Sequence, residues 1–354
     1  MGLARGPSRR RTEFRLPGLI TATIVLALLL PAPPEGLAQT KPRTRLQVPY
    51  STIGAASTPT WLAKDAGLFE RHGLDVTLVY LAGATKAIAA MLSGEAPIVQ
   101  SAGTGTILAR LNGSDVVHVA HYIDRLIQAL YVDPAIRGPA ELKGKVIGIT
   151  RFGALTDFGV RYLLRTWNLV PIQDVGIQQM GGFAEIVAGM QGGALHGGIA
   201  SPPFTTRMKK LGYRELANLA RLDFRFPSTV ISVPGFYLRS QEDVVRRFLR
   251  AYVEAIAQVK TNEELAIRVI SRWTRERDHE ILTESYRFFR DIYEAAPYPT
   301  VEGVRNVLEW EGERNPRAKQ ARPEEFIAPR YVKELDDSGF IRQLYPRPDK
   351  GERR

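Results

Sequence analysis

Short apolar strands that run into loops of serine, threonine and glycine, each followed by a helix, recur along this chain. The first unit has a strand at 46–50, a loop at 51–58 and a helix from Trp61, and the same order starts again with a strand at 145–149 and a loop at 150–155. Alternation of strands and helices predicts α/β layers with largely parallel strands. Because the pattern occurs twice, we expect two lobes of similar layout.

The order of the elements predicts how the chain divides between these lobes. Lobe one is expected to be discontinuous and to comprise 44–134 together with 235–345, the second part being a run of C-terminal helices. Lobe two is expected to comprise 138–232, and 346–354 to form a disordered tail. Each lobe would hold a mixed sheet flanked by helices.

A chain divided in this way crosses between the lobes twice. The crossings are expected near 133–138 and near 233–237, where glycine and proline occur. These residues suit segments that change direction and absorb backbone rotation. We therefore expect two crossover segments that act as a hinge.

The first 38 residues have the order of a secretory signal peptide. Five arginines precede an uncharged apolar run at 19–30, which is followed by prolines and then by Gly36, Leu37 and Ala38. Basic, then apolar, then small residues is the order of a cleavable signal. The apolar run is also shorter than the roughly 20 residues of a membrane-spanning helix. We expect cleavage after Ala38 and export by either the Sec or the twin-arginine route.

The chain has no cysteine and a net charge of +11. Without cysteine it has no disulfide, no thiolate metal site and no thiol to carry a lipid anchor, so we expect a free periplasmic protein. The positive charge is scattered through mixtures of arginine and acidic residues, such as 272–280 and 314–325. That pattern indicates solvated helix faces and argues against a nucleic-acid partner.

Four loops between a strand end and a helix predict where a ligand binds. They lie at 51–58, 101–106, 153–157 and 201–204. The first turn of a helix offers free backbone N–H groups and the positive end of the helix dipole, and such loops gather at the carboxyl ends of parallel strands. The candidate ligand-binding residues are Ser51, Thr52, Ser57, Trp61, Ser101, Gly103, Thr104, Gly153, Ala154, Thr156, Ser201 and Pro202.

Aromatic and basic residues next to these loops are further candidates. Arg125 and Arg151 follow predicted strands, where a guanidinium could grip an anion with two hydrogen bonds or form an exposed ion pair. The aromatic residues could stack on a flat ligand or belong to the core; they are Tyr50, Trp61, Phe152, Phe183 and Phe204.

Side chains for catalysis are not arranged in a recognisable pattern. Among the five histidines, His118 and His121 bracket two apolar residues, and a metal site there would need further ligands. No serine, histidine and acidic residue stand in the arrangement of an activated nucleophile. We therefore expect neither catalytic residues, nor a cofactor, nor a metal.

Several segments resemble the periplasmic substrate-binding proteins for nitrate, sulfonates, taurine and thiamine-pyrimidine precursors. They occur in the same order as in that family, at 60–76, 92–95, 142–148 and 248–252. The resemblance implies a type II periplasmic binding protein fold, a small-molecule ligand captured by closure of two lobes, and delivery to the permease and ATPase of an ABC importer. We expect a monomer.

Two other functions remain open at this point. One is an enzyme of the same superfamily that acts on a small heteroaromatic or sulfur compound, although the related fungal enzymes and desulfinases need cysteines that this chain lacks. The other is a ligand-sensing partner of a membrane receptor. The identity of the ligand is open as well, because helix N-termini and hydroxyl groups accept many oxyanions alike.

Overall fold

The computed structural model describes Gly2, residues 42–223 and residues 225–346. Apart from Gly2, the predicted signal peptide lies outside these residues, as does almost all of the predicted tail. Within the described part of the chain, no helix is both long and apolar enough to span a membrane. From Pro42 onward the described residues form one compact unit that contains both predicted sheets.

The first sheet has the strand order β2-β1-β3-β10-β4. Strands β1, β2 and β3 are parallel, whereas β10 pairs antiparallel with both β3 and β4. Exposed and buried residues alternate in the N-terminal part of β1 and of β2, toward the β2 edge of the sheet, whereas β3, β4 and β10 are buried throughout. The strands are β1 (Thr44–Tyr50), β2 (Leu74–Tyr80), β3 (Val99–Ser101), β4 (Val116–Ile123) and β10 (Thr229–Pro234).

The second sheet repeats this arrangement with the order β7-β6-β8-β5-β9. Strand β6 is parallel to β7 and β8, and β5 is antiparallel to β8 and β9. In each sheet one strand beside a crossing, β10 or β5, runs antiparallel to its neighbours, which confirms the prediction of two mixed sheets. The strands are β5 (Ala129–Val132), β6 (Val146–Ile149), β7 (Gly176–Gln179), β8 (Gly197–Ala200) and β9 (Arg214–Asn218).

The crossings lie elsewhere than the sequence predicts. Strand β5 belongs to the second sheet although the predicted boundary places it in lobe one, and β10 belongs to the first sheet although most of it falls within 138–232. The chain therefore crosses at 124–128 and at 222–228. Both strands are buried along their whole length, so their residues carry no alternation that would indicate which sheet they join.

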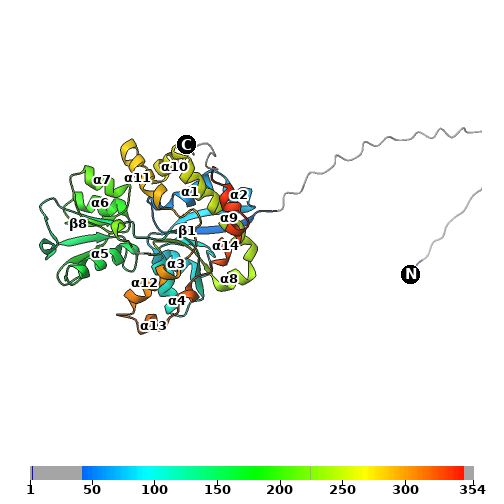
Figure 1. Cartoon of the computed structure of the whole chain (residues 1–354), viewed down its shortest axis with the longest axis horizontal. Coiled ribbons are helices and arrows are strands. Elements are labelled where there is room, and N and C mark those ends of the chain that lie inside the picture. The colour runs from blue at the N-terminus through cyan, green and yellow to red at the C-terminus, as the bar shows by residue number, and fades with distance from the viewer. Residues whose placement is uncertain (1, 3–41, 224, 347–354) are drawn as a thin grey trace, which may run out of the picture. The chain divides into compact units, whose positions relative to one another are not determined.

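Helices cover both sheets. In Figure 1, α5, α6 and α7 surround β8, while α9, α10 and α14 lie beside the N-terminal elements α1, α2 and β1. The helices of the first lobe are α1 (Thr58–Asp65), α2 (Leu68–Arg71), α3 (Ala84–Leu92), α4 (Gly103–Leu111), α8 (Gly235–Ser240), α9 (Glu242–Thr261), α10 (Glu263–Thr274), α11 (His279–Ile292), α12 (Val301–Glu311), α13 (Pro316–Gln320), α14 (Arg330–Asp337) and α15 (Phe340–Gln343). Those of the second are α5 (Leu155–Thr166), α6 (Phe183–Gln191) and α7 (Phe204–Lys210).

Helix α9 anchors the C-terminal helices to the first sheet. Its buried stripe includes Phe248 and Tyr252; Phe248 stacks on Phe69 of α2 at 5.1 Å, and the hydroxyl of Tyr252 lies 2.7 Å from that of Thr60 in α1. A stripe of apolar residues at helical spacing is the pattern that buries one face of a helix. These contacts explain why residues 200 positions apart form one lobe.

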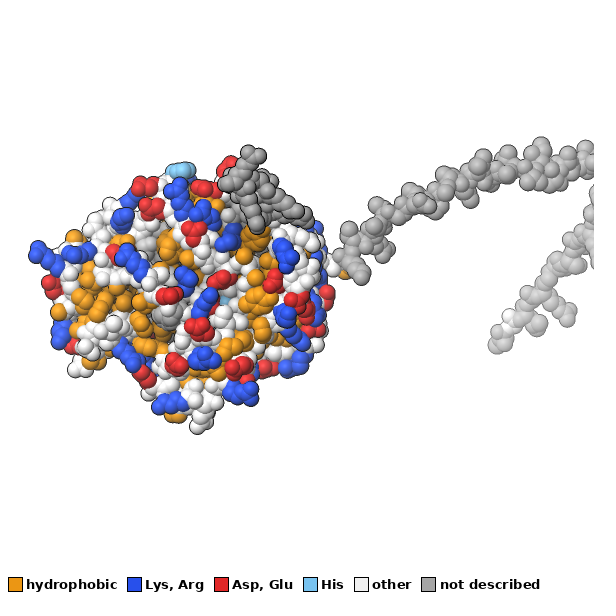
Figure 2. Space-filling view, in the orientation of Figure 1, with side chains coloured by type: hydrophobic (Ala, Val, Ile, Leu, Met, Phe, Trp, Pro, Cys, Tyr) orange, Lys and Arg blue, Asp and Glu red, His pale blue; other side chains and the backbone are white. Residues whose placement is uncertain are grey.

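Charged side chains cover the surface without segregation by sign. On the face shown in Figure 2, basic and acidic side chains are interspersed. Many of them form ion pairs, such as Arg246 with Glu334 at 2.7 Å and Arg247 with Asp243 at 2.8 Å. This agrees with the expectation that the net charge is distributed over solvated helices.

Candidate functional site

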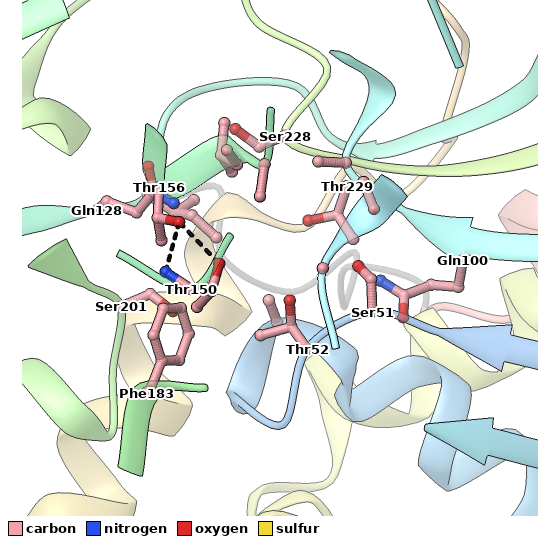
Figure 3. A pocket seen from close by; sticks show the side chains of 17 residues that line it. Ser51, Thr52, Gln100, Gln128, Thr150, Thr156, Phe183, Ser201, Ser228 and Thr229 are labelled. Carbon is pink, nitrogen blue, oxygen red and sulfur yellow. Dashed lines mark hydrogen bonds between the residues drawn. The ribbon is translucent and has the colours of Figure 1, made fainter. Parts of the chain in front are cut away.

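A cavity lies between the two sheets, where the carboxyl ends of their parallel strands meet. Hydroxyl groups and two amides dominate its wall, and no charged side chain lines it. The space open to a water-sized sphere is about 40 Å³, enough for a few atoms. The polar side chains are Ser51, Thr52, Gln100, Gln128, Thr150, Thr156, Ser201, Ser228 and Thr229 (Figure 3).

Both lobes and both crossings contribute to the wall. Ser51 follows β1 in the first sheet, and Thr150 and Ser201 follow β6 and β8 in the second. Gln128 and Ser228 end the two crossings. Because parallel strands present their carboxyl ends at one edge, the loops that follow them gather in one place. Motion about the crossings would therefore change the size of the cavity directly.

Four helices begin at this cavity. Their N-cap residues are Gly83 for α3, Ala102 for α4, Ala154 for α5 and Gly182 for α6, and none of these caps supplies a side-chain hydrogen bond to the first turn. The first three line the cavity, and Phe183 after Gly182 does so too. The backbone N–H groups and the positive dipole ends that result are suited to the oxygens of an anion.

Three buried polar atoms of the wall have no hydrogen-bond partner among the described residues. They are the hydroxyl oxygens of Ser201 and Ser228 and the amide oxygen of Gln128. These residues are 1%, 2% and 2% exposed. A buried polar group without a partner costs about 1–3 kcal/mol, and most such groups in proteins are satisfied. A bound ligand with hydrogen-bonding groups would remove this cost.

Two other hydroxyls of the wall are satisfied within the protein. Thr150 Oγ1 lies 2.7 Å from Thr156 Oγ1, and the backbone N–H of Thr150 donates to Thr156 Oγ1 at 3.0 Å. Both bonds are drawn in Figure 3. This pair holds the loop after β6 against the first turn of α5, so it orders the wall.

The structure brings five of the predicted ligand-binding residues together at the cavity. These are Ser51, Thr52, Ala154, Thr156 and Ser201. They come from three of the four predicted loops, and from both lobes. The fourth loop, at 101–106, contributes Ala102 instead.

The other predicted residues of lobe one lie behind the wall. Ser57 Oγ donates to the carbonyl oxygen of Thr52 at 2.8 Å, and Ser101 Oγ donates to that of Ala102 at 3.3 Å. Trp61 is fully buried and stacks on Trp273, with ring centroids 5.4 Å apart. These three side chains support the lobe.

Two residues of the loop at 101–106 are also displaced from the cavity. A Cβ on Gly103 would lie 2.7 Å from Pro227 Cβ, so this glycine allows α4 to approach the second crossing closely. Its backbone N–H donates to the carbonyl oxygen of Pro227 at 2.8 Å. Thr104 is buried in α4, and its hydroxyl has no partner in the described part of the chain.

The remaining predicted residues of lobe two shape its loops. Gly153 has a φ of +76°, which side chains rarely adopt, and its N–H donates to Asp157 Oδ2 at 3.0 Å. Pro202 forms a cis peptide bond with Pro203, and its carbonyl oxygen accepts the N–H of Ala55 from lobe one at 3.4 Å. Neither residue lines the cavity.

Sequence reasoning missed part of the wall. Gln100, Gln128, Thr150, Ser228 and Thr229 all line the cavity, and none was among the candidate ligand residues, whereas Phe183, which also lines it, was among the aromatic candidates. Gln128 and Ser228 were missed because the crossings were placed too far along the chain. Gln100 and Gln128 each interrupt an apolar run, and a polar amide in a buried strand is the signal that could have identified them.

Arg151 connects the lobes and does not line the cavity. Its Nε donates to the carbonyl oxygen of Ala82 in lobe one at 2.6 Å. A second link joins Arg207 of α7 to the buried carboxylate of Glu276 at 2.6 Å. With the bond between Ala55 and Pro202, these contacts hold the lobes against each other beside the cavity.

A chain of buried polar residues joins the two crossings behind the site. His118 Nδ1 lies 2.8 Å from His121 Nε2, and His121 Nδ1 lies 3.3 Å from Asp124 Oδ1. Asp124 starts the first crossing; it accepts the hydroxyl of Thr300 at 2.7 Å and lies 3.6 Å from Arg225 in the second crossing. Burial, with His121 close by, lowers the pKa of His118 well below its ordinary value.

A metal site is not found in the described residues, where no group of three or more histidine, cysteine, aspartate or glutamate side chains could hold an ion. In the cluster at His118 the side chains of His118, His121 and Asp124 bond to one another. The wall of the cavity, with hydroxyls, amides and helix N-termini, can bind an oxyanion by hydrogen bonds. It offers no activated nucleophile.

Comparisons with known proteins agree with this architecture. A family model described as NMT1/THI5 like matches residues 55–266. In sequence, no curated protein matches the chain.

Solved structures of similar fold are numerous. One from Bordetella bronchiseptica has a TM-score of 0.77 at 18% identity, covering 84% of this chain and 98% of its own. The periplasmic nitrate-binding protein NrtA of Synechocystis has a TM-score of 0.71 at 14% identity, covering 86% and 91%. The alkanesulfonate-binding protein SsuA of Xanthomonas axonopodis, bound to MOPS, has a TM-score of 0.67 at 15% identity, covering 80% and 98%. These similarities confirm the two-lobed periplasmic binding protein fold.

Proposed function

The chain belongs to the NMT1/THI5-like family, and on this premise we propose that it is the exported solute-binding component of an ABC-type importer. It captures a small oxyanion, such as a sulfonate or nitrate, between its lobes and presents it to a permease and ATPase. It acts in the periplasm as a monomer without a lipid anchor. Catalysis is not part of this role.

One observation carries the proposal: polar atoms without partners, buried in a cavity that both lobes enclose. The hydroxyls of Ser201 and Ser228 come from lobe two and from the second crossing, and both are more than nine-tenths buried. Four helix N-termini meet at the same cavity. Hydroxyl donors combined with helix N-termini favour an anion whose oxygens accept several hydrogen bonds.

No charged side chain lines the cavity, so its wall favours anions that are ionised at every ordinary pH. A sulfonate or nitrate keeps its charge at all ordinary pH values, so hydrogen bonds from neutral donors can hold it without a cationic side chain. Two proteins of this fold are named for alkanesulfonate and nitrate binding. Taurine, which carries a sulfonate, belongs to the same chemical class.

Ligand capture by closure follows from the contacts between the lobes. Arg151, Pro202 and Arg207 of lobe two each bond to lobe one beside the cavity. Such contacts exist only when the lobes are together, so they stabilise the closed conformation. A ligand that satisfies groups of both lobes shifts the equilibrium in the same direction.

We expect the melting temperature of the purified protein to rise with one class of small anion. Stabilisation by a ligand at a hundredfold excess over Kd is about 2.7 kcal/mol, which corresponds to a shift of about 5 °C for a protein of this size. Differential scanning fluorimetry with nitrate, alkanesulfonates, taurine, pyrimidines and aromatic acids would measure it. Absence of any shift, together with turnover of one of these compounds, would contradict a binding function.

We expect the substitution Arg151→Met to weaken ligand binding by about 10-fold. The substitution removes the hydrogen bond to Ala82 across the lobes and leaves the cavity wall unchanged, so the closed conformation loses stability relative to the open one. Isothermal titration calorimetry would measure the affinity, with Arg214→Met, at an exposed arginine of the same lobe, as the control. Equal affinity in the wild type and Arg151→Met would show that this contact does not contribute to closure.

A further inference from the structure

An aromatic groove continues the cavity outward between the lobes. We call it the outer groove and define it by the apolar residues Tyr50, Ile53, Tyr80, Phe183, Phe204 and Trp273 and by four charged residues discussed below. The space open to a water-sized sphere is about 530 Å³, against about 40 Å³ in the cavity. This volume is typical of a site for an organic molecule and exceeds what nitrate or methanesulfonate would fill.

The cavity and the outer groove are lined by neighbouring residues of the same loops. Tyr50 lines the groove and Ser51, the next residue, lines the cavity; Phe204 lines the groove and Ser201 lines the cavity. Phe183 lines both spaces. A Cβ on Gly54 would lie 3.4 Å from the ring of Phe183, so the ring stands at the junction against lobe one. A ligand that occupies both spaces contacts this ring.

Aromatic side chains form a wall on each lobe. In lobe one, Tyr50 has its ring centroid 5.5 Å from Tyr80 and 6.1 Å from Trp273. In lobe two, the centroids of Phe183 and Phe204 are 5.5 Å apart. Aromatic rings pack favourably at such distances, with an offset or edge-to-face orientation. A flat ring between the two walls would contact both lobes.

The indole of Trp273 is fixed in place before any ligand arrives. Its Nε1 donates to Asp65 Oδ2 at 3.0 Å, and its ring stacks on that of Trp61. Tyr80 by contrast is 37% exposed. The lobe-one wall therefore combines a rigid ring with an accessible one, and the accessible ring can be changed without disturbing the core.

Charge at the outer groove favours an anion over a neutral compound. Three arginines and one glutamate line it: Arg207, Arg272, Arg275 and Glu185. Arg207 pairs with Glu276 and Arg272 with Asp65. Arg275 is exposed and has no ion-pair partner in the described part of the chain; it caps α10 in a left-handed conformation, with a φ of 58°. With two of the three arginines paired, Arg275 is the lining cation that is available to attract an anion.

We propose that the ligand is an aromatic sulfonate or a similar aromatic oxyanion that occupies the cavity and the outer groove together. This inference rests on the proposed binding function and narrows its ligand class. The oxyanion is held at the hydroxyls and helix N-termini of the cavity. The ring lies between the aromatic walls of the two lobes, where its burial adds affinity that a small alkyl sulfonate lacks.

The test compares two sulfonates by isothermal titration calorimetry on the full mature chain. Benzenesulfonate is expected to bind about 10-fold or more tightly than methanesulfonate. In Tyr80→Ser the ratio of the two affinities is expected to fall at least about threefold. Arg275→Asn, which suits the left-handed backbone, is expected to weaken binding of both anions about twofold. The matched control is Phe236→Ser, at an aromatic residue of α8 that is 56% exposed and outside the groove.

The outcomes separate this proposal from the binding function. If both sulfonates bind equally, or if Tyr80→Ser leaves their ratio unchanged, the outer groove does not hold the ligand, while the oxyanion site in the cavity stands. Binding of nitrate without binding of either sulfonate would likewise show that the outer groove does not hold the ligand. If no oxyanion binds at all, both proposals are wrong.

Discussion

The double substitution Ser201→Ala and Ser228→Ala is expected to weaken ligand binding by about 100-fold or more without lowering the melting temperature of the unliganded protein. Each serine hydroxyl would lose a hydrogen bond to a charged ligand, worth about 1.5–3 kcal/mol. In the unliganded protein neither hydroxyl has a partner among the described residues, so its removal ends a desolvation cost. Calorimetric titration and thermal unfolding of the same samples would measure both effects.

Ser285→Ala is the matched control for this result. Ser285 is also fully buried, but it lies in α11, away from the cavity wall, and its hydroxyl donates to the carbonyl oxygen of Ile281 at 2.6 Å. Its substitution should lower the melting temperature and leave the affinity unchanged. If the double variant instead loses stability and keeps its affinity, the two unpartnered hydroxyls serve the fold and the site has been misplaced.

The serines of the predicted ligand loops show which part of the site can be predicted from the sequence and which part cannot. Ser51 and Ser201 were found because each directly follows a strand, and the carboxyl ends of parallel strands face the ligand. Ser57 and Ser101 have the same residue type and occur in similar loops, yet both side chains bond to nearby backbone carbonyl oxygens. Which hydroxyl in a loop faces the cavity depends on local backbone geometry, and residue type does not encode it.

The sequence predicted the two sheets of the fold, but it did not predict where the chain crosses between them. The repeated order of strand, loop and helix predicted both mixed sheets, and the apolar stripe of α9 explains why the C-terminal helices return to the first lobe. The positions of the crossings were wrong because β5 and β10 are buried along their whole length and show no alternation of exposed and buried residues. Which sheet such a strand joins depends on the neighbouring strands against which it packs, and those strands lie far away in the sequence.

The crossings matter because Gln128 and Ser228 stand at their ends. The crossings were predicted several residues too far toward the C-terminus, so neither residue was included in the predicted site. The same error conceals the link between Asp124 and Arg225, which joins the two crossings. In the proposed mechanism, the hinge and the binding site share residues that adjoin in the chain, so closure and ligand contact would be coupled by short segments of backbone.

Acid is expected to destabilise the protein through His118, which lies behind these crossings. In the folded protein burial holds the pKa of His118 well below 6.5, so its imidazole stays neutral. In the unfolded chain an ordinary histidine binds a proton as the pH falls through about 6.5. Below that pH the unfolded state binds more protons, so stability decreases as the pH decreases. Between pH 7 and pH 5 this group alone should lower the free energy of unfolding by up to about 2 kcal/mol, the limit set by the pKa of an ordinary histidine in the unfolded chain.

The variant His118→Asn isolates this contribution. An asparagine can place a polar atom where Nδ1 of His118 meets His121, and it does not titrate. Urea unfolding at pH 5, 6 and 7 should therefore give a shallower decrease in stability for His118→Asn than for the wild type, whatever its stability at pH 7. His279→Asn, at an exposed histidine of α11, controls for the loss of a histidine as such. Parallel pH profiles for the wild type and His118→Asn would show that the acid sensitivity arises from other groups.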